Sequence, residues 1–171
     1  MGEKWLPIEG FEIYQISNRG RVYNSETERM MALSRTRQGV VKVGLYLHPR
    51  QYTKGVTRLV AEAFLPRHEN PLFNTAMHVD GDRSNNNVDN LIWRPRWFVK
   101  DYVLQFKREP FAFGPIEEID TLEYFDSTWE AAIKFGLIER DIVRSLEKHL
   151  PVWPTKQTFR FCPKVSIHKY S

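Results

Sequence analysis

His78 stands at the edge of the most polar stretch of this chain. Residues 80–90 hold four Asn and three Asp within eleven positions, which is not the composition of a helix or strand interior. Side chains of these types hydrogen-bond to nearby backbone and build elaborate loops. Because imidazole titrates near neutral pH, a histidine beside such a loop is the first residue to consider for chemistry. The alternative is an ordinary surface histidine.

Two segments with helical periodicity flank this polar stretch. Apolar residues recur at helical spacing between Val56 and Phe64, and Pro66 ends the run. Residues 93–108 resume the helical period with an aromatic stripe, which is more often core than a binding surface; its members are Trp97, Phe98, Tyr102 and Phe106. The polar stretch is therefore expected to be a loop held between regular elements.

The first third of the chain reads as short strands and turns, and it carries the basic excess. Asn18-Arg19-Gly20 is a turn signal, and residues 40–47 alternate like a half-buried strand. Residues 1–58 hold 10 Lys and Arg against 5 Asp and Glu, whereas the whole chain has a net charge of +4. A small basic sheet can lie along a phosphate backbone, and a solvated basic face is an equal alternative. The candidate DNA contacts are Arg19, Arg21, Arg35, Arg37 and Lys42.

The last third begins with a linker-like segment around Pro110, Gly114 and Pro115. A strand is expected over 118–125, followed by an N-cap at 126–128 and a helix over 129–135. Gly136 breaks that helix, and a second is expected from about 138 to 148. Two short helices around a glycine-containing turn indicate a helix-turn-helix, although any pair of antiparallel helices gives a similar pattern.

In a helix-turn-helix the start of the second helix faces base edges in the major groove. Arg140, Arg144 and Lys148 are the candidate contacts to guanine or phosphate on this helix. Glu139 and Asp141 would repel phosphate there unless they accept hydrogen bonds from cytosine.

Three stretches resemble, in order, the modules of phage intron-encoded HNH homing endonucleases. Residues 5–23 look like the N-terminal module, residues 57–93 like the HNH core, and residues 126–161 like the C-terminal helix-turn-helix repeat. Three ordered motifs over nearly the whole chain are far more specific than any one of them, and they leave little room for an unrelated basic adaptor domain.

The resemblance implies roles for the residues around His78. His78 would be the general base that activates water to attack phosphorus, and Asn90 would fix the loop and orient that base. Asn85 and Asn86 match the loop asparagines of the family, and Asp80 with Gly81 matches its turn. The implied reaction is hydrolysis of a phosphodiester bond, as a nick or a cut in DNA, with one Mg²⁺ or Mn²⁺ ion as cofactor.

Two positions depart from the family pattern at the metal. Met77 stands where the family has a ligand directly before the base, and Val99 stands at the matching position of the second ligand. A thioether and an alkyl group offer Mg²⁺ or Mn²⁺ nothing useful. Rescue by other acids is an alternative, with Asp80, Asp82, Asp89 or Asp101 as donors. No residue is therefore assigned as a metal ligand, and enzymatic activity is left open.

The expected fold class is α+β, with a small N-terminal antiparallel β module, a ββα-metal core and a C-terminal helix-turn-helix module. The expected boundaries are 1–55, 56–108 and 109–171, the last including the linker. No apolar run approaches the roughly 20 residues that cross a bilayer, and the single cysteine, Cys162, fits a reducing compartment.

The expected partner is double-stranded DNA, bound by a monomer in the cytoplasm of a bacterial cell that hosts a phage, with no membrane partner. The alternative is a catalytically degenerate relative that acts as a DNA-binding or protein-binding phage factor. Its protein partner would come from the phage or the host.

Overall fold

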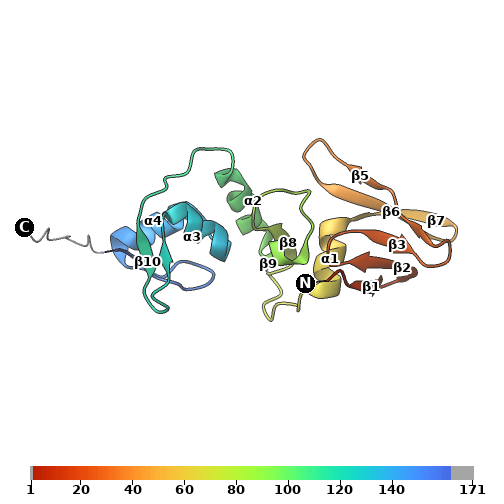
Figure 1. Cartoon of the computed structure of the whole chain (residues 1–171), viewed down its shortest axis with the longest axis horizontal. Helices are drawn as coiled ribbons and strands as arrows, with labels where there is room; N and C mark the ends of the chain where they lie inside the picture. The colour runs from red at the N-terminus through yellow and green to blue at the C-terminus, as the bar shows by residue number, and fades with distance from the viewer. Residues whose placement is uncertain (1, 163–171) are drawn as a thin grey trace, which may run out of the picture. The chain divides into compact units, whose positions relative to one another are not determined.

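The computed structural model describes residues 2–162. The chain divides into two compact units, residues 1–100 and residues 101–171, and Figure 1 shows the elements of each in chain order. Both units combine small antiparallel sheets with helices, and there are four α-helices among the described residues. The expected α+β class is confirmed. The three-module boundaries at 55 and 108 stay a prediction.

The first unit begins with seven short strands in two antiparallel sheets. The sheet orders are β1-β2-β3-β4 and β5-β6-β7. The strands are β1 (Trp5–Ile8), β2 (Phe11–Ser17), β3 (Val22–Asn24), β4 (Arg29–Met30), β5 (Leu33–Arg35), β6 (Val41–Leu47) and β7 (Arg50–Gly55). Alternation along β6 is the expected one: Val41, Val43 and Leu45 are buried, and the residues between them are partly exposed.

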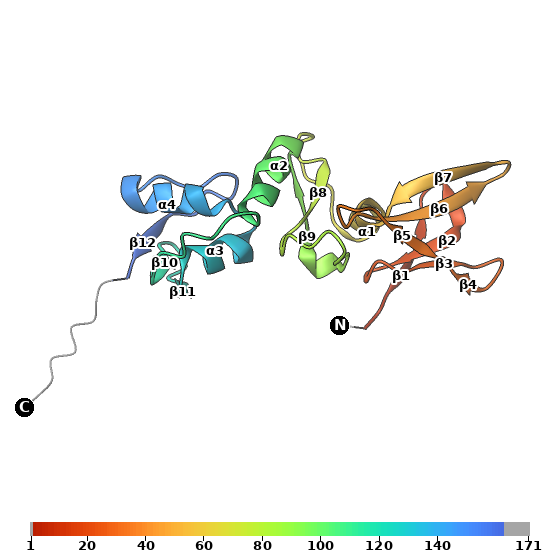
Figure 2. The same ribbon diagram turned by 90° about the horizontal axis from the view of Figure 1, so that it is seen from above.

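Helix α1 (Val56–Phe64) supplies the common core of the first unit. Its buried residues, among them Leu59 and Val60, join one apolar cluster with Ile16 of β2, Leu45 of β6 and Leu91. In Figures 1 and 2 the helix lies between the N-terminal sheets and the hairpin that follows it. The N-terminal strands and the segment after α1 therefore share a single core.

The first unit ends with a two-stranded hairpin and the first half of a helix. Strand β8 (Thr75–His78) pairs with β9 (Leu91–Arg94), so that Met77 faces Ile92 and His78 faces Leu91 in register. The loop between them ends in a short 3₁₀ turn, η1 (Val88–Asn90), and α2 (Arg96–Gln105) follows. The helix expected from residue 93 thus begins later, because residues 91–94 pair as a strand.

The second unit has three short strands and two helices. They are β10 (Ile116–Glu118), β11 (Tyr124–Phe125), α3 (Thr128–Phe135), α4 (Glu139–Lys148) and β12 (Phe159–Phe161), with the sheet order β11-β10-β12. Its core includes Ile116, Ile142 and Phe159. Within the described residues, no helix has both the length and the apolar character needed to span a bilayer.

The boundaries of α3 follow from local capping, whereas one expected strand does not form. Ser127 caps α3 by accepting from the N–H of Glu130, and Gly136 ends the helix in the left-handed region. The single strand expected over 118–125 is wrong: the carboxylate of Glu118 accepts from both the N–H and the hydroxyl of Thr121 at 2.7 Å. These bonds turn the chain and divide the segment into β10 and β11.

Candidate active site and nucleic-acid interface

Asn90 closes the loop between β8 and β9. Its Oδ1 accepts from the N–H of Asp80 at 3.0 Å, and its Nδ2 donates to Asp80 Oδ1 and to the carbonyl of Asn85, each at 2.9 Å. The side chain of Asn85 donates to the second oxygen of Asp80 at 2.7 Å. Three of the predicted site residues are thus brought together, and they fix the shape of the loop.

The acids of this loop accept hydrogen bonds from the loop itself. Asp82 Oδ1 accepts from the N–H and the hydroxyl of Ser84, and these bonds hold the pKa of the Asp82 carboxyl below its usual value. Asp80 Oδ1 accepts from the N–H of Asp82 in addition to its bond from Asn90. Much of the acceptor capacity of both carboxylates serves to build the loop.

His78 is held by Asn86 and Thr57. The Nε2 atom of His78 lies 3.1 Å from Asn86 Oδ1 and 3.4 Å from Thr57 Oγ1. The hydroxyl of Thr57 donates to the same Asn86 oxygen at 2.7 Å, and the Asn86 amide nitrogen donates to the carbonyl of Ser84 at 3.3 Å. Asn86 is almost fully buried, with 5% of its surface exposed, so its orientation is set by these partners.

This network determines which nitrogen of His78 carries the proton. Turning the Asn86 amide round would bring its oxygen against the Ser84 carbonyl, so the oxygen faces His78 and Thr57. An amide oxygen has no proton and can only accept hydrogen bonds. The Asn86 oxygen accepts one from Thr57 and a second from His78, so Nε2 must be the protonated nitrogen of His78. The lone pair of a neutral His78 is then on Nδ1, the atom that can take up a proton.

The environment of His78 favours the uncharged ring. Burial lowers the pKa of His78 below its ordinary value, and the hydrogen bond to Asn86 and the charges of Asp80 and Asp82 oppose that shift only in part. The lowered pKa favours the neutral imidazole, which is the state that a proton acceptor requires.

The positions expected to hold a metal do not fit a hard divalent ion. Met77 on β8 is buried, with 1% of its surface exposed, and Val99 on α2 is half-buried. Neither side chain carries an oxygen or a nitrogen, and Mg²⁺ and Mn²⁺ bind through such atoms. Within residues 2–162, no three His, Cys, Asp or Glu side chains are grouped so that they could hold a metal ion. The loop is assembled, but the expected ligands are absent.

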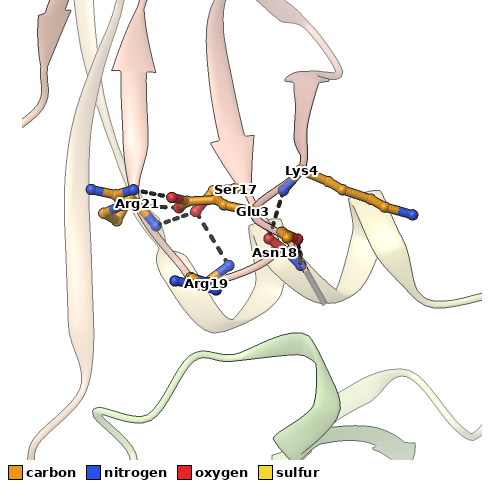
Figure 3. Close-up of polar contacts among 7 residues, drawn as sticks. Glu3, Lys4, Ser17, Asn18, Arg19 and Arg21 are labelled. Carbon is orange, nitrogen blue, oxygen red and sulfur yellow. Dashed lines mark hydrogen bonds and ion pairs between the residues drawn. The ribbon is translucent and has the colours of Figure 1, made fainter.

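The four predicted arginines of the first unit are exposed, and Lys42 is half-buried. Arg19 and Arg21 project from the turn between β2 and β3, shown in Figure 3. Arg35 and Arg37 are exposed at the end of β5 and just beyond it. Lys42 pairs with Ser34 of β5 and Gly55 of β7, on the face of the sheet opposite to the buried residues of β6. Lys42 therefore lies on the outer face of this sheet, whereas Arg35 pairs with Val41 and lies on the other face at the end of β5.

The predicted cations of the second unit form one stripe. Arg140, Arg144 and Lys148 are exposed on α4 at intervals of four residues, which places them on one side of the helix. Arg144 also lies 3.6 Å from Asp141 in an exposed ion pair.

The expectation that Glu139 faces phosphate is wrong. Only 3% of its surface is exposed. Its carboxylate accepts from the N–H groups of Phe111 and Ala112 at 2.9 and 2.8 Å and from the hydroxyl of Thr128 at 2.8 Å. Glu139 therefore ties the linker to the helix pair, because these donors need an acceptor.

Three residues near the predicted site were missed from the sequence. Thr57 and Gly20 contact Asn86 from distant parts of the chain, and Glu3 forms a bidentate ion pair with Arg21. No local pattern marks Thr57 or Glu3. The turn signal at Gly20 was visible, but its partner was not.

Parts of this chain are similar in sequence to a known motif family and to HNH endonucleases. Residues 3–46 match the NUMOD4 motif family. An uncharacterised HNH endonuclease of Acanthamoeba polyphaga mimivirus, L245, is 38% identical over 94 residues, which are 54% of this chain and 27% of that protein. DNA endonuclease I-HmuI of Bacillus phage SP01 is 34% identical over 91 residues, which are 53% of this chain and 51% of the relative. The chain thus spans between a quarter and a half of these curated relatives.

A solved structure extends the similarity beyond these segments. The structure described as "DNA binding and cleavage by the HNH homing endonuclease I-HmuI" superposes with a TM-score of 0.54 at 26% identity, covering 93% of this chain and 98% of that one. The resemblance predicted from the three ordered motifs is confirmed by the relatives and by this structure.

Proposed function

We propose, from the premise that this chain is a relative of the HNH homing endonucleases in sequence and fold, that it binds double-stranded DNA. The observation that carries the proposal is the exposure of Arg35 and Arg37 at the end of β5 and just beyond it, with Lys42 on the outer face of the neighbouring strand β6. The solved structure that this chain resembles is described as one of DNA binding and cleavage by an HNH homing endonuclease. Exposed cations on a small sheet neutralise phosphates, and side chains between them contact base edges.

The two units would then contribute separate contacts along the duplex. In the second unit, α3 and α4 are two short helices around Gly136, and the stripe of Arg140, Arg144 and Lys148 would face the DNA as in a helix-turn-helix. Arg19 and Arg21 would add phosphate contacts beside the loop of His78.

The test is a fluorescence-anisotropy titration of duplex DNA over a range of salt concentrations. Each cation that contacts a phosphate contributes about one unit to the slope of log K against log salt. Arg35→Ala and Arg37→Ala should each reduce that slope by about one. Arg67→Ala, at an exposed position outside the proposed surface, serves as the control. Absence of duplex binding at low salt would refute the proposal and point to a protein partner.

Phosphodiester hydrolysis is the second candidate function, and the His78 network favours it. Asn86 and Thr57 hold the proton on Nε2, Nδ1 can accept a proton from water, and Asn90 keeps the loop closed around them. Without ligands for an ion that neutralises the phosphate, cleavage would be slower by several powers of ten, at about 1.4 kcal/mol for each power.

Nicking of a supercoiled plasmid with Mg²⁺ or Mn²⁺ distinguishes the two candidates. Relaxed circles that accumulate with the wild-type chain and not with His78→Ala would establish hydrolysis. Salt-sensitive binding with no His78-dependent nicks would leave DNA binding as the function of the chain.

A further inference from the structure

The turn that carries Arg19 and Arg21 packs against the loop that holds His78. The carbonyl of Asn18 accepts from the N–H of Val88 at 2.8 Å. Gly20 has a φ of +79°, and a Cβ atom there would lie 2.7 Å from the Cβ of Asn86. Two segments that are far apart in the sequence are therefore in direct contact at the residue that bonds to His78.

The turn is fixed internally as well. The hydroxyl oxygen of Ser17 accepts from the N–H groups of Arg19 and Arg21 at 3.2 and 3.0 Å, and the carbonyl of Ser17 accepts from Gly20 at 3.0 Å. Asn18 Oδ1 accepts from the N–H of Lys4 at 2.9 Å, which ties the turn to the start of the chain. Figure 3 shows Ser17 between the two arginines and Asn18 beside Lys4.

We infer that the turn over residues 17–21 positions His78: Gly20 and Asn18 set the place of the Asn86 loop, and Asn86 sets the orientation of the ring. One rigid assembly then carries both the Nδ1 atom of His78 and any phosphate that Arg19 or Arg21 holds. Gly20, Asn86 and Thr57 are positioning residues in this scheme, since they act through His78. The phosphate part rests on the proposed function, whereas the positioning part does not.

Glycine is required at position 20 for two reasons that can be separated. The positive φ disfavours any side chain, and the approach of Asn86 leaves no room for one. Gly10 offers a matched comparison, because its φ is +74° but a Cβ atom there would meet nothing within 4 Å. Gly20→Ala therefore displaces Asn86, and Gly10→Ala imposes similar backbone strain without touching the loop.

The experiment is long-range ¹H–¹⁵N NMR of the histidine rings in the full-length chain, with His78→Gln used to assign His78. Spectra are taken at a pH where the ring is uncharged. We expect the wild type and Gly10→Ala to carry the His78 proton on Nε2, and Gly20→Ala to show a mixture of the two tautomers. An unchanged His78 ring and an unshifted Asn86 amide in Gly20→Ala would overturn the inference.

Two further variants keep the test decisive if Gly20→Ala does not fold. Ser17→Ala removes the acceptor of the Arg19 and Arg21 N–H groups without adding an atom, and Thr57→Val removes the donor to Asn86 while keeping the shape of the side chain. Both are expected to weaken the preference for Nε2, and a wild-type ring in both would refute the inference. Duplex binding is measured on the same samples. If the wild-type chain does not bind duplex DNA, that result counts against the proposed function and not against the positioning of His78.

Discussion

At the scale of single residues, His78 depends on a buried amide more than on its neighbours in sequence. Asn90 was expected to orient it, but the amide of Asn90 bonds to Asp80 and Asn85, and it is Asn86 that contacts the ring. The sequence indicated a loop rich in hydrogen bonds and a histidine at its edge. It could not indicate which of four asparagines faces the ring, because that depends on the path of the loop and on Thr57 of α1.

The lowered pKa of His78 has a consequence for stability. Since the folded chain resists protonation of a buried ring, the unfolded chain takes up that proton first as the pH falls. We expect the contribution of His78 to the free energy of unfolding to be intact above the ordinary imidazole value of about 6.5 and to decline below it. Urea unfolding of the wild type and His78→Gln across this range measures the difference. A difference that grows on acidification would contradict the assignment.

Arg21 is bound by a carboxylate where a phosphate would bind. Glu3 accepts from two nitrogens of its guanidinium, one of them at 2.9 Å, and such bidentate geometry suits phosphate equally. We expect Glu3→Gln to tighten duplex binding about two- to five-fold, the equivalent of an exposed ion pair worth up to about 1 kcal/mol. Glu26→Gln removes the same charge from an exposed position of the first unit and is the control. Equal gains from both variants would show a general charge effect.

The missing metal ligands can be supplied. Met77→Asp combined with Val99→Asn places oxygen donors at the two positions where the family resemblance implies metal ligands, and hard cations bind such donors. We expect isothermal titration calorimetry to detect Mn²⁺ binding to the double variant and not to the wild type. Met30→Asp adds the same charge at an exposed site and controls for non-specific attraction. A folded double variant that binds no more Mn²⁺ than this control would contradict the account.

At the scale of elements, the sequence predicted the features that depend on interactions between neighbouring residues. The alternation of β6, the end of α1 near Pro66 and the Ser127 cap with Gly136 after α3 follow from the sequence and are present in the structure. Tertiary partners decided the rest. Trp93 joins β9 because that strand pairs with β8, and Glu118 turns the chain where a longer strand was expected.

Glu139 is an element-scale example of the same limit. Its position at the start of α4 suggested a side chain that faces DNA, yet Glu139 is the acceptor for three donors of the linker and α3. We expect Glu139→Ala to destabilise the second unit by about 2–4 kcal/mol, since the buried Thr128 hydroxyl left without an acceptor costs about 1–3 kcal/mol and the partly buried N–H groups of Phe111 and Ala112 add less. Urea unfolding measures this, with Glu147→Ala on the exposed side of α4 as the control. A loss no larger than that of the control would contradict the role.

At the scale of the whole molecule, the order of the three motifs in the sequence predicted the family and the mixed α/β fold. What could not be predicted was the shared core of the first unit, in which strands β1–β7 and the β8–β9 hairpin meet on α1. That core is the reason why a turn near residue 20 touches a loop near residue 86. The turn that carries Arg19 and Arg21 and the site of His78 are parts of one folded unit.

The most direct test of the account is a titration of duplex DNA with the full-length chain, once with Mg²⁺ and once with EDTA. The same samples are then analysed by denaturing electrophoresis. We expect salt-sensitive binding that EDTA does not weaken, and DNA strands that remain intact over the course of the titration. Binding that requires the divalent ion, or rapid nicking that disappears in His78→Ala, would contradict a DNA-binding chain whose HNH loop lacks metal ligands.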